Sequence, residues 1–282
     1  MRFESFFRGK KVLITGGSSG IGLALAQNLS TQGCHIHLLA RNRETLDSAL
    51  EIIRSIQNNP SVHIGAVSAD VRDPDSINEA IDRMSRDAGL PDFVINSAGV
   101  SHPGCVQDLD LEIFRRTMDV NYHGTVHVTK AVLPGMIERG SGHIINISSV
   151  AGFLGVFGYT AYCASKFAVM GFSDTLRAEV KPLGIRVSVA LPPDTETPMF
   201  VNAEALKPYV TKALSKNVKA MSAESVAAII LRDIARGKYL ILPGFETKML
   251  YFLTRISGTM IYPIMDYLIA RAAKTTERKN FK

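Results

Sequence analysis

A short apolar strand that runs directly into a glycine-rich turn is the feature that most constrains the fold of this chain. Residues 12–15 read Val-Leu-Ile-Thr, and residues 16–22 read Gly-Gly-Ser-Ser-Gly-Ile-Gly. Apolar residues then recur at Ile21, Leu25 and Leu29, as they do on one face of a helix. The glycines let the backbone approach a pyrophosphate, and the free N–H groups at the start of the helix can bind it. The spacing is G-x-x-x-G-x-G, and its position between a strand and a helix favours a dinucleotide site over a plain turn. The binding residues expected here are Thr15, Gly16, Ser18, Ser19, Gly20, Ile21 and Gly22.

The second apolar strand, residues 35–40, ends at three polar residues. Arg41, Asn42 and Arg43 follow it, and no acid occurs before Glu44. The end of this strand faces the adenosine ribose in a βαβ nucleotide unit, where an acid binds the 2′-hydroxyl of NAD and arginine accommodates the 2′-phosphate of NADP. The sequence therefore favours NADP(H), bound through Arg41, Asn42 and Arg43. Alternatively, Arg41 only opens the next helix.

Strands alternate with helices through the rest of the first 200 residues. We expect further strands at 62–68, 92–96, 143–148 and 185–191, with helical patterns at 73–88, at 110–139 with interruptions at Asn121 and Pro134, and from the region of Tyr162 to about residue 180. This alternation, without a long polar linker, predicts an α/β fold with one doubly wound parallel sheet, the Rossmann type, over residues 1–242. The strand ends supply more candidate cofactor residues, namely Asp70, Val71, Asn96, Ala98 and Gly99.

Tyr162 and Lys166 lie four residues apart, so they share one face of a helix. An ammonium close to a phenol favours the phenolate, and we therefore expect Lys166 to lower the pKa of Tyr162. Such a tyrosine can act as a general acid or base near neutral pH. Ser149 follows the strand at 143–148, and its hydroxyl could hydrogen-bond the same substrate oxygen. Taken alone, a Tyr-x-x-x-Lys pair also fits a solvated helix face.

Together these motifs resemble the short-chain dehydrogenase/reductase family over about residues 9–200. The resemblance implies a fold with seven parallel strands and a catalytic tetrad of Asn121, Ser149, Tyr162 and Lys166. Lys166 would also bind the nicotinamide ribose, and Asn121 would hold a water in a proton relay, unless it is only a helix-kink residue. After the sixth strand the family usually has Pro-Gly followed by Thr; here Pro192-Pro193 replaces Pro-Gly, and Thr197 is retained. The cofactor residues expected in this loop are Pro192, Thr195 and Thr197.

The loop Pro-Pro-Asp-Thr-Glu-Thr-Pro at 192–198 also supports a narrower resemblance, together with residues 155–162 and 179–182. Family members with these features reduce the ketone of a long-chain sphingoid base with NADPH at the cytosolic side of a membrane. The resemblance implies that 3-ketodihydrosphingosine is reduced to dihydrosphingosine. An alternative substrate is another lipid, steroid or retinoid carbonyl. Residues 199–220 could form a lid over the substrate or an ordinary surface helix.

A sensor that binds NADPH without turnover is a further alternative, but it would have no need of both Tyr162 and Lys166. The family resemblance also implies a homodimer or homotetramer formed through the helix that carries Tyr162.

The net charge is distributed unevenly, at −3 for residues 1–206 and +9 for residues 207–282. The basic tail shows no groove-reading or base-stacking motif, so nucleic acid is not expected as a partner. Three cysteines without metal-ligand spacing predict neither a disulfide framework nor a metal site. The N-terminus lacks the apolar run of a signal peptide, and we expect a cytoplasmic protein.

We expect residues 243–282 to form a helical C-terminal extension that is apolar and basic. Within the apolar stretch 249–270, Arg255 and Asp266 leave only ten uninterrupted residues between them, about half the length of a membrane-spanning helix. Tyrosines and flanking lysines and arginines favour a segment that lies in the surface of an anionic membrane. We therefore expect peripheral attachment to the cytosolic face of a membrane. Alternatively, the extension packs over the substrate pocket or a sister subunit.

Overall fold

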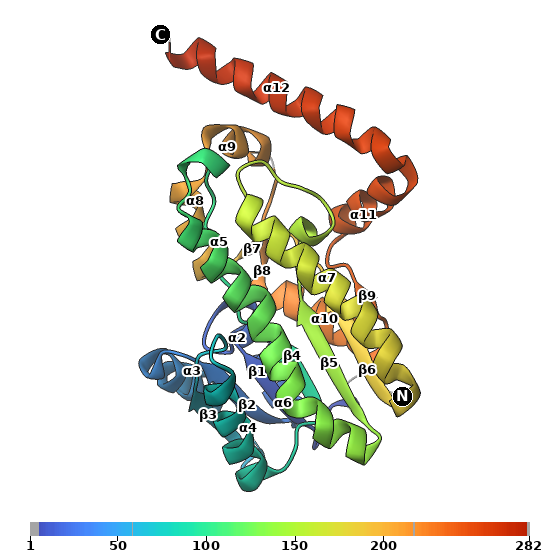
Figure 1. Ribbon diagram of the computed structural model, residues 1–282. Helices are drawn as coiled ribbons and strands as arrows, with labels where there is room; N and C mark the ends of the chain where they lie inside the picture. The colour runs from blue at the N-terminus through green and yellow to red at the C-terminus, as the bar shows by residue number, and fades with distance from the viewer. Residues whose placement is uncertain (1–5, 58, 217, 281–282) are drawn as a thin grey trace.

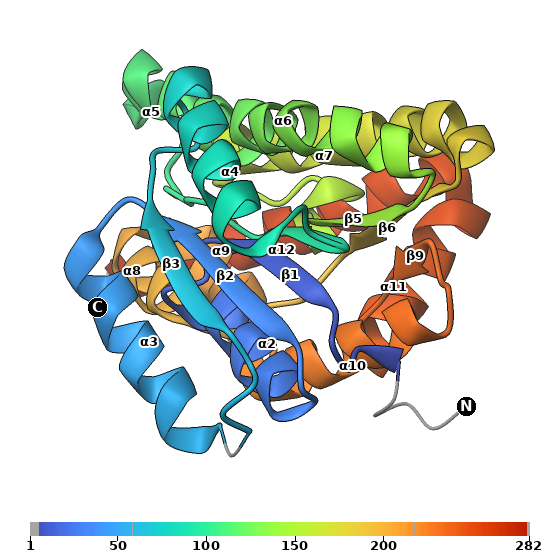
Figure 2. The same cartoon turned by 90° about the horizontal axis from the view of Figure 1, so that it is seen from below.

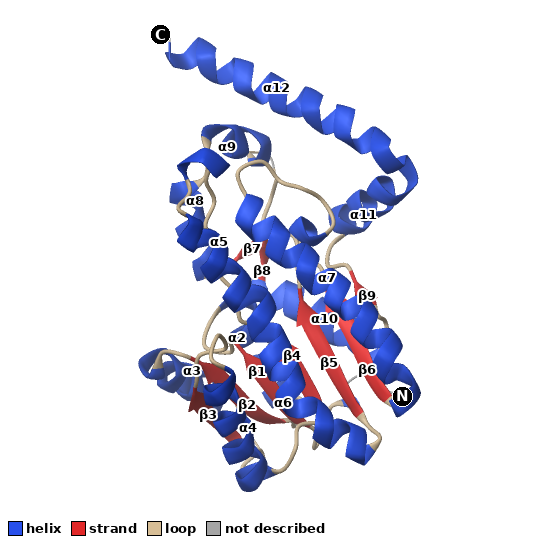
Figure 3. Ribbon diagram, in the orientation of Figure 1, coloured by secondary structure: helices blue, strands red, loops and turns tan. Residues whose placement is uncertain are grey.

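Seven parallel strands form the central sheet of the protein. The computed structural model describes residues 6–57, 59–216 and 218–280. The strand order is β3-β2-β1-β4-β5-β6-β9, so the direction of winding reverses between β1 and β4 (Figure 3). The strands are β1 (Lys11–Thr15), β2 (His35–Ala40), β3 (Ile64–Ser68), β4 (Phe93–Asn96), β5 (Gly142–Ile147), β6 (Ile185–Ala190) and β9 (Leu240–Ile241). The predicted Rossmann-type α/β fold is confirmed.

Helices cover both faces of the sheet and form a three-layer structure (Figure 2). Alternate residues of each strand enter opposite layers, as Ile14 and Leu13 of β1 do. One layer contains α2 (Gly20–Thr31), α3 (Arg43–Ile56) and α10 (Ala223–Ala235). The other contains α4 (Pro74–Ala88), α6 (Gly124–Arg139) and α7 (Thr160–Val180). Apolar side chains dominate both cores, which hold the strand ends in fixed positions for a site.

The helical pattern at 110–139 is α5 (Leu111–Met118) and α6 joined by a π-helical turn, η2 (Asp119–His123). The interruption expected at Asn121 is therefore a local widening of the helix. The interruption expected at Pro134 does not occur, because Pro134 lies inside α6 and the helix continues to Arg139.

The carboxyl end of the sheet is covered by the later part of the chain (Figure 1). β7 (Thr195–Glu196) and β8 (Met221–Ser222) pair as a small second sheet. Between these two strands the chain forms α8 (Pro198–Leu206) and α9 (Tyr209–Ser215). The C-terminal extension consists of α11 (Phe245–Ser257), the turn η5 (Gly258–Met260) and α12 (Ile261–Asn280). Figure 1 shows α12 lying across α9, which it contacts. Short 3₁₀ turns occur at η1 (Val106–Asp108), η3 (Val150–Gly152) and η4 (Lys181–Leu183).

Part of the extension packs against the body of the protein. The Tyr251 ring of α11 meets the Phe153 ring edge-on, with 5.2 Å between the ring centroids. Among the described residues, no helix is both long enough and apolar enough to cross a membrane.

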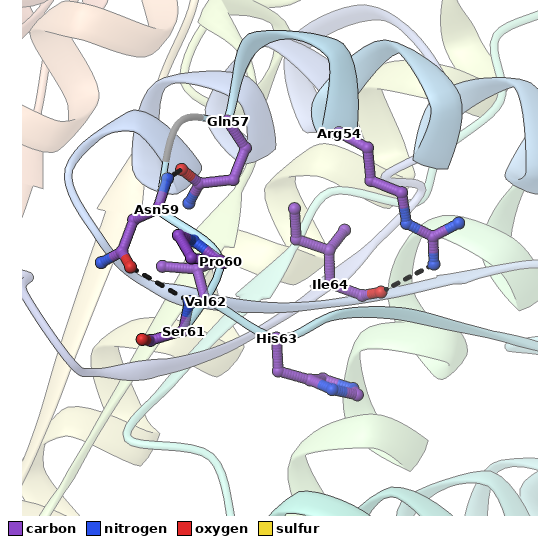
Figure 4. Close-up of a pocket in the computed structure, with 8 residues that line it drawn as sticks. All are labelled: Arg54, Gln57, Asn59, Pro60, Ser61, Val62, His63 and Ile64. Atoms are coloured by element: carbon purple, nitrogen blue, oxygen red, sulfur yellow. Dashed lines mark hydrogen bonds between the residues drawn. The ribbon is translucent and has the colours of Figure 1, made fainter.

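An open hollow of about 520 Å³ lies where the chain enters β3 (Figure 4). It is lined by Arg54 and residues 57 and 59–64, and the Arg54 guanidinium donates to the Ile64 carbonyl at 3.1 Å. Because Ile64 begins β3, the hollow lies at the amino ends of the strands, opposite the site described next.

Candidate active site

The candidate site lies at the carboxyl ends of the strands, at the point where the strand order reverses. Ligands bind at this position in open α/β sheets. The first turn of α7 carries Tyr162, and the next turn carries Lys166, whose side chain is buried. The Lys166 ammonium lies 5.6 Å from the centre of the Tyr162 ring and donates to the Ile147 carbonyl at 2.9 Å. Lys166 is therefore held at the end of β5, beside the tyrosine.

Ser149 lies directly after β5 and is the N-cap of the turn η3. Its Oγ accepts a hydrogen bond from the Ala151 N–H at 3.1 Å, and the Ser149 and Tyr162 hydroxyls are hydrogen-bonded to one another. The neighbouring Ser148 hydroxyl donates to the Lys166 carbonyl at 2.9 Å and ties α7 to the end of β5. Three of the four residues of the predicted tetrad thus form one group.

The electrostatics of this group differ from the sequence-based expectation. Burial raises the pKa of Tyr162 to about 12, although the hydrogen bond from Ser149 acts in the opposite direction. The pKa of Lys166 is lowered to about 8 by its burial. We expected Lys166 to lower the pKa of Tyr162; instead, loss of hydration of the phenolate dominates, and no direct hydrogen bond joins the two side chains in the described chain. The phenol is consequently protonated at neutral pH, which is the state needed to donate a proton.

Asn121 completes the predicted tetrad and lies buried in the π-helical turn. Its Oδ1 accepts from the Val100 N–H at 2.8 Å, and its Nδ2 donates to the Val100 carbonyl and to Ser165 Oγ. Both amide hydrogens are thus engaged by the protein, and Asn121 fixes the loop after β4. A Cβ added to Gly99 would lie 3.3 Å from Asn121 Oδ1 and 3.7 Å from Lys166 Nζ, so Gly99 lies between these two side chains. The proton-relay role of Asn121 stays a prediction.

The glycine-rich turn requires glycine at the predicted positions. Gly16 and Gly20 have φ values of +64° and +55°, which favour glycine. A Cβ on Gly16 would lie 2.8 Å from the Ala98 Cα, and one on Gly22 would lie 2.3 Å from the Gly16 carbonyl oxygen. Ser19 is the N-cap of α2, but its side chain makes no capping hydrogen bond. The first N–H groups of α2, at Gly20, Ile21 and Gly22, can therefore be offered to a phosphate, with the Ser18 and Ser19 hydroxyls beside them.

An acidic residue and two arginines meet where β2 and β3 end. Asp70 Oδ2 lies 2.7 Å from Arg72 Nη2 and 3.9 Å from Arg41 Nη1. The hydrogen bonds and charge of Arg72, with the charge of Arg41, lower the pKa of Asp70 against the effect of burial. The Arg41 side chain is 48% exposed and can reach an anion. Arg72 was not among the candidates, although its position two residues after Asp70 was a usable signal.

Two other candidates beside Arg41 have structural partners of their own. Asn42 caps α3 by accepting from the Thr45 N–H at 3.0 Å. Arg43 pairs with Asp47 one turn later, at 3.1 Å. The structure therefore leaves Arg41 as the strongest candidate for a 2′-phosphate.

Three further candidates point into the protein and position the site instead of lining it. The Thr15 hydroxyl accepts from the Ser97 and Ala98 N–H groups, both at 3.1 Å, and so fixes the loop after β4. Asn96 is buried and donates to Asn146 Oδ1 at 2.9 Å. Val71 is buried too, in the layer of α4 and α6.

The loop at 192–197 connects the two halves of the site. The Pro192 carbonyl accepts from the Val150 N–H at 3.1 Å, next to Ser149. At its other end, Thr197 lies against the glycine-rich turn, since a Cβ on Gly20 would lie 3.0 Å from Thr197 Cγ2. The Thr195 hydroxyl donates to the Pro193 carbonyl at 2.8 Å. A nicotinamide ring placed between Ser149 and the glycine-rich turn would therefore face this loop.

Residues 199–220 contain most of the short helix α8 and all of α9, and the start of α9 packs on the loop before Tyr162. The Thr211 hydroxyl donates to the Phe157 carbonyl at 2.8 Å, and Pro208 lies against Gly158. The lid role of this segment stays a prediction.

The family model described as short chain dehydrogenase matches residues 10–207. The chain therefore belongs to the short-chain dehydrogenase/reductase family, and it is an oxidoreductase that uses a nicotinamide cofactor.

Among its relatives, 3-ketodihydrosphingosine reductase of Bos taurus is 39% identical over 247 residues, which cover 87% of this chain and 74% of the relative. Dehydrogenase/reductase SDR family member 7B of Xenopus laevis is 33% identical, and the match covers 100% of this chain and 87% of the relative. A solved short-chain dehydrogenase of Sphingobium yanoikuyae, in complex with NADPH, is 28% identical with a TM-score of 0.75; the match covers 89% of this chain and 95% of that one.

Proposed function

We propose that this protein reduces the ketone of a long-chain sphingoid base, converting 3-ketodihydrosphingosine to dihydrosphingosine with NADPH. The proposal rests on one observation: Ser149, Tyr162 and Lys166 lie together at the end of β5, beside the glycine-rich turn. The similarity to the bovine reductase over most of both chains supports the substrate.

In the proposed mechanism, Ser149 and Tyr162 hydrogen-bond the ketone oxygen. NADPH, when bound, supplies the hydride to the carbonyl carbon. Tyr162 Oη then gives its proton to the oxygen that develops negative charge. The raised pKa of Tyr162 suits this direction, because the phenol is fully protonated at neutral pH and an alkoxide is a far stronger base. The charge of Lys166 stabilises the phenolate that remains, and its position also suits a contact with the nicotinamide ribose.

For the cofactor, we propose that the first turn of α2 binds the pyrophosphate and that Arg41 binds the 2′-phosphate of NADPH. A Cβ on Gly16 or Gly22 would clash with neighbouring backbone atoms, so only glycine permits the tight turn that presents the first N–H groups of α2 to a dinucleotide. Arg72 supports Arg41 indirectly by engaging Asp70, which would otherwise compete for the Arg41 guanidinium.

The test is to incubate the purified protein and NADPH with 3-ketodihydrosphingosine, a steroid ketone and a retinal, and to follow the loss of nicotinamide absorbance. We expect the sphingoid ketone to be reduced with the highest kcat/KM. Preference for the steroid or the retinal would replace the proposed substrate, and NADPH binding without any turnover would support a sensor.

We also propose that the protein binds peripherally to the cytosolic face of an anionic membrane. Large apolar side chains are exposed along the extension, for example Phe245 at 79%, Phe252 at 58% and Ile256 at 84%. Leu111 and Val201 are likewise exposed, on the helices α5 and α8 that Figure 1 shows at the same end of the molecule. Basic side chains, including Lys248 and Arg255, lie among them, which suits anionic lipid. A long-chain substrate could then enter from the lipid.

Flotation with anionic liposomes tests this attachment. We expect the wild type to float and a variant with Phe252→Glu and Ile256→Glu to stay at the bottom of the gradient. The matched control is Ile52→Glu with Ile56→Glu, which changes two exposed apolar residues of α3, far from the extension, and should float. If the wild type does not float at low salt, the extension is not a membrane anchor.

A homodimer or homotetramer through α7 remains our proposal for the assembly. Phe167 of this helix is 45% exposed. Sedimentation of the wild type and of Phe167→Glu would test it, and we expect the substitution to shift the protein toward monomer.

A further inference from the structure

Asp194 lies in the loop that connects the two halves of the candidate site, and the mechanism above gives it no role. Its backbone is fixed from both sides. Two residues earlier, the Pro192 carbonyl accepts from the Val150 N–H at 3.1 Å, and the carbonyl of Asp194 itself accepts from the Met221 N–H at 2.9 Å. Thr195 then begins the short strand β7. The carboxylate is thus presented from a rigid segment beside the turn that contains Ser149.

The charge of Asp194 acts on the reactive end of the site. Tyr159 and Tyr162 are neighbours, with 6.0 Å between their ring centroids. The negative charge of Asp194 adds to the burial that raises the pKa of both phenols. The charge of Asp194 therefore reaches the phenol that would contact the substrate oxygen.

No group in the described parts of the chain neutralises Asp194. It takes part in no ion pair within 4 Å, and its carboxylate accepts no hydrogen bond. The cation that acts on it, Lys207, is already bound to Glu204 at 2.6 Å and lies 4.8 Å from the centre of the Phe200 ring. Burial raises the pKa of Asp194, and the opposing charges of Lys207 and Glu204 act on it from a distance, so no cation of the described chain is paired with its carboxylate. Solvent reaches the residue, and a cationic ligand can therefore reach it too.

We propose that Asp194 binds the ammonium group of a 2-amino ketone and so makes the site selective for amino ketones over plain ketones. This inference rests on the proposed ketoreductase function. In such a substrate the ammonium is on the carbon next to the carbonyl carbon. The nitrogen is thus only two bonds away from the carbonyl carbon. When Ser149 and Tyr162 hold the ketone oxygen, the ammonium therefore stays near these two side chains. A carboxylate close to Tyr162 is placed to receive it, and an apolar lipid ketone would leave that carboxylate unused.

The test compares two ketones of equal chain length, one with and one without the 2-amino group, in the wild type and in Asp194→Asn. Asparagine keeps the shape of the side chain and removes its charge. We expect kcat/KM for the amino ketone to fall about 10- to 100-fold, the loss typical of a charge-assisted hydrogen bond. For the plain ketone we expect a change of less than about threefold, with NADPH affinity unaltered. Glu196→Gln, an exposed carboxylate two residues away, is the matched control and should leave both substrates unchanged.

The outcomes separate this inference from the proposed function. Equal losses for both ketones in Asp194→Asn would overturn it and make Asp194 a structural residue. A wild type that reduces the plain ketone as well as the amino ketone would also overturn the inference, while the ketoreductase function would stand. A wild type that reduces neither ketone would overturn the proposed function itself.

Discussion

The reduction rate should fall as the pH rises above about 8, and the group responsible should be Lys166. Burial lowers the pKa of Lys166 to about 8, whereas Tyr162, at about 12, does not titrate in the usable range. If the mechanism needs the ammonium, the competent fraction is about nine-tenths at about pH 7 and about one-tenth at about pH 9. The value of kcat/KM for ketone reduction should therefore fall about tenfold between these two pH values. The oxidation of the alcohol needs the phenolate and should instead gain from rising pH as far as Lys166 permits.

The quantity to measure is kcat/KM for the ketone at saturating NADPH, which reports the groups of the enzyme form that binds the ketone. A ketone without an ionisable group should be used, so that titration of the substrate does not enter the profile. Lys166→Met keeps much of the side-chain length without the charge, and we expect its low residual activity to be independent of pH across the same range. A wild-type profile that stays flat from about pH 7 to 10 would refute the reasoning, because Lys166 would then either keep its proton or contribute no charge to the reaction.

Three further predictions concern the chemistry, the cofactor and the stability. Tyr162→Phe removes the proton donor and should lower kcat by a factor of about 10²–10⁴ with NADPH binding intact; retention of a tenth of wild-type kcat would exclude Tyr162 as the acid. Arg41→Ala should weaken NADPH binding by about 1.5–3 kcal/mol in titration calorimetry and leave NADH nearly unaffected, whereas equal losses would make Arg41 structural. Burial lowers the pKa of His37 to about 4 and of His143 to about 3. The unfolded chain therefore takes up more protons than the folded chain as the pH falls below about 6.5, and stability should decrease toward about pH 4, by about 3 kcal/mol for His37 alone. Urea unfolding at neutral and acid pH measures this loss, and equal stabilities would contradict it.

The fold was predictable from the sequence wherever local patterns carried the information. The strands at the centre of the sheet are apolar runs followed by polar residues, and their bounds were found to within two residues. The seventh strand, β9, was missed because Leu240–Ile241 is only two residues long and is defined by pairing with β6. The helices of the extension were anticipated only as an apolar, helical tail, since packing of α12 on α9 joins segments that are distant in the sequence.

For the site, helix geometry predicted that Tyr162 and Lys166 are neighbours, but not how their environment shifts their pKa values. Those shifts depend on burial by many residues, which no motif records. The sequence also could not show which way a residue at a strand end faces. Thr15 and Asn96 stand at the ends of β1 and β4, yet both turn their side chains into protein hydrogen bonds and hold the loops that form the site.

The π-helical turn at 119–123 places one extra residue inside an otherwise continuous pair of helices. A helix advances about 100° per residue, so deleting one residue here would rotate all of α6 by about that angle relative to α5. Val128, Val132 and Met136, now fully buried against the sheet, would leave the core, and Asn121 would lose its hold on Val100. No single substitution could return these three side chains to the core, because the rotation of the whole helix decides where each of them points. Both folding and the site therefore constrain the length of this turn, and a one-residue deletion here should be far less tolerated than one in the loop at 59–63.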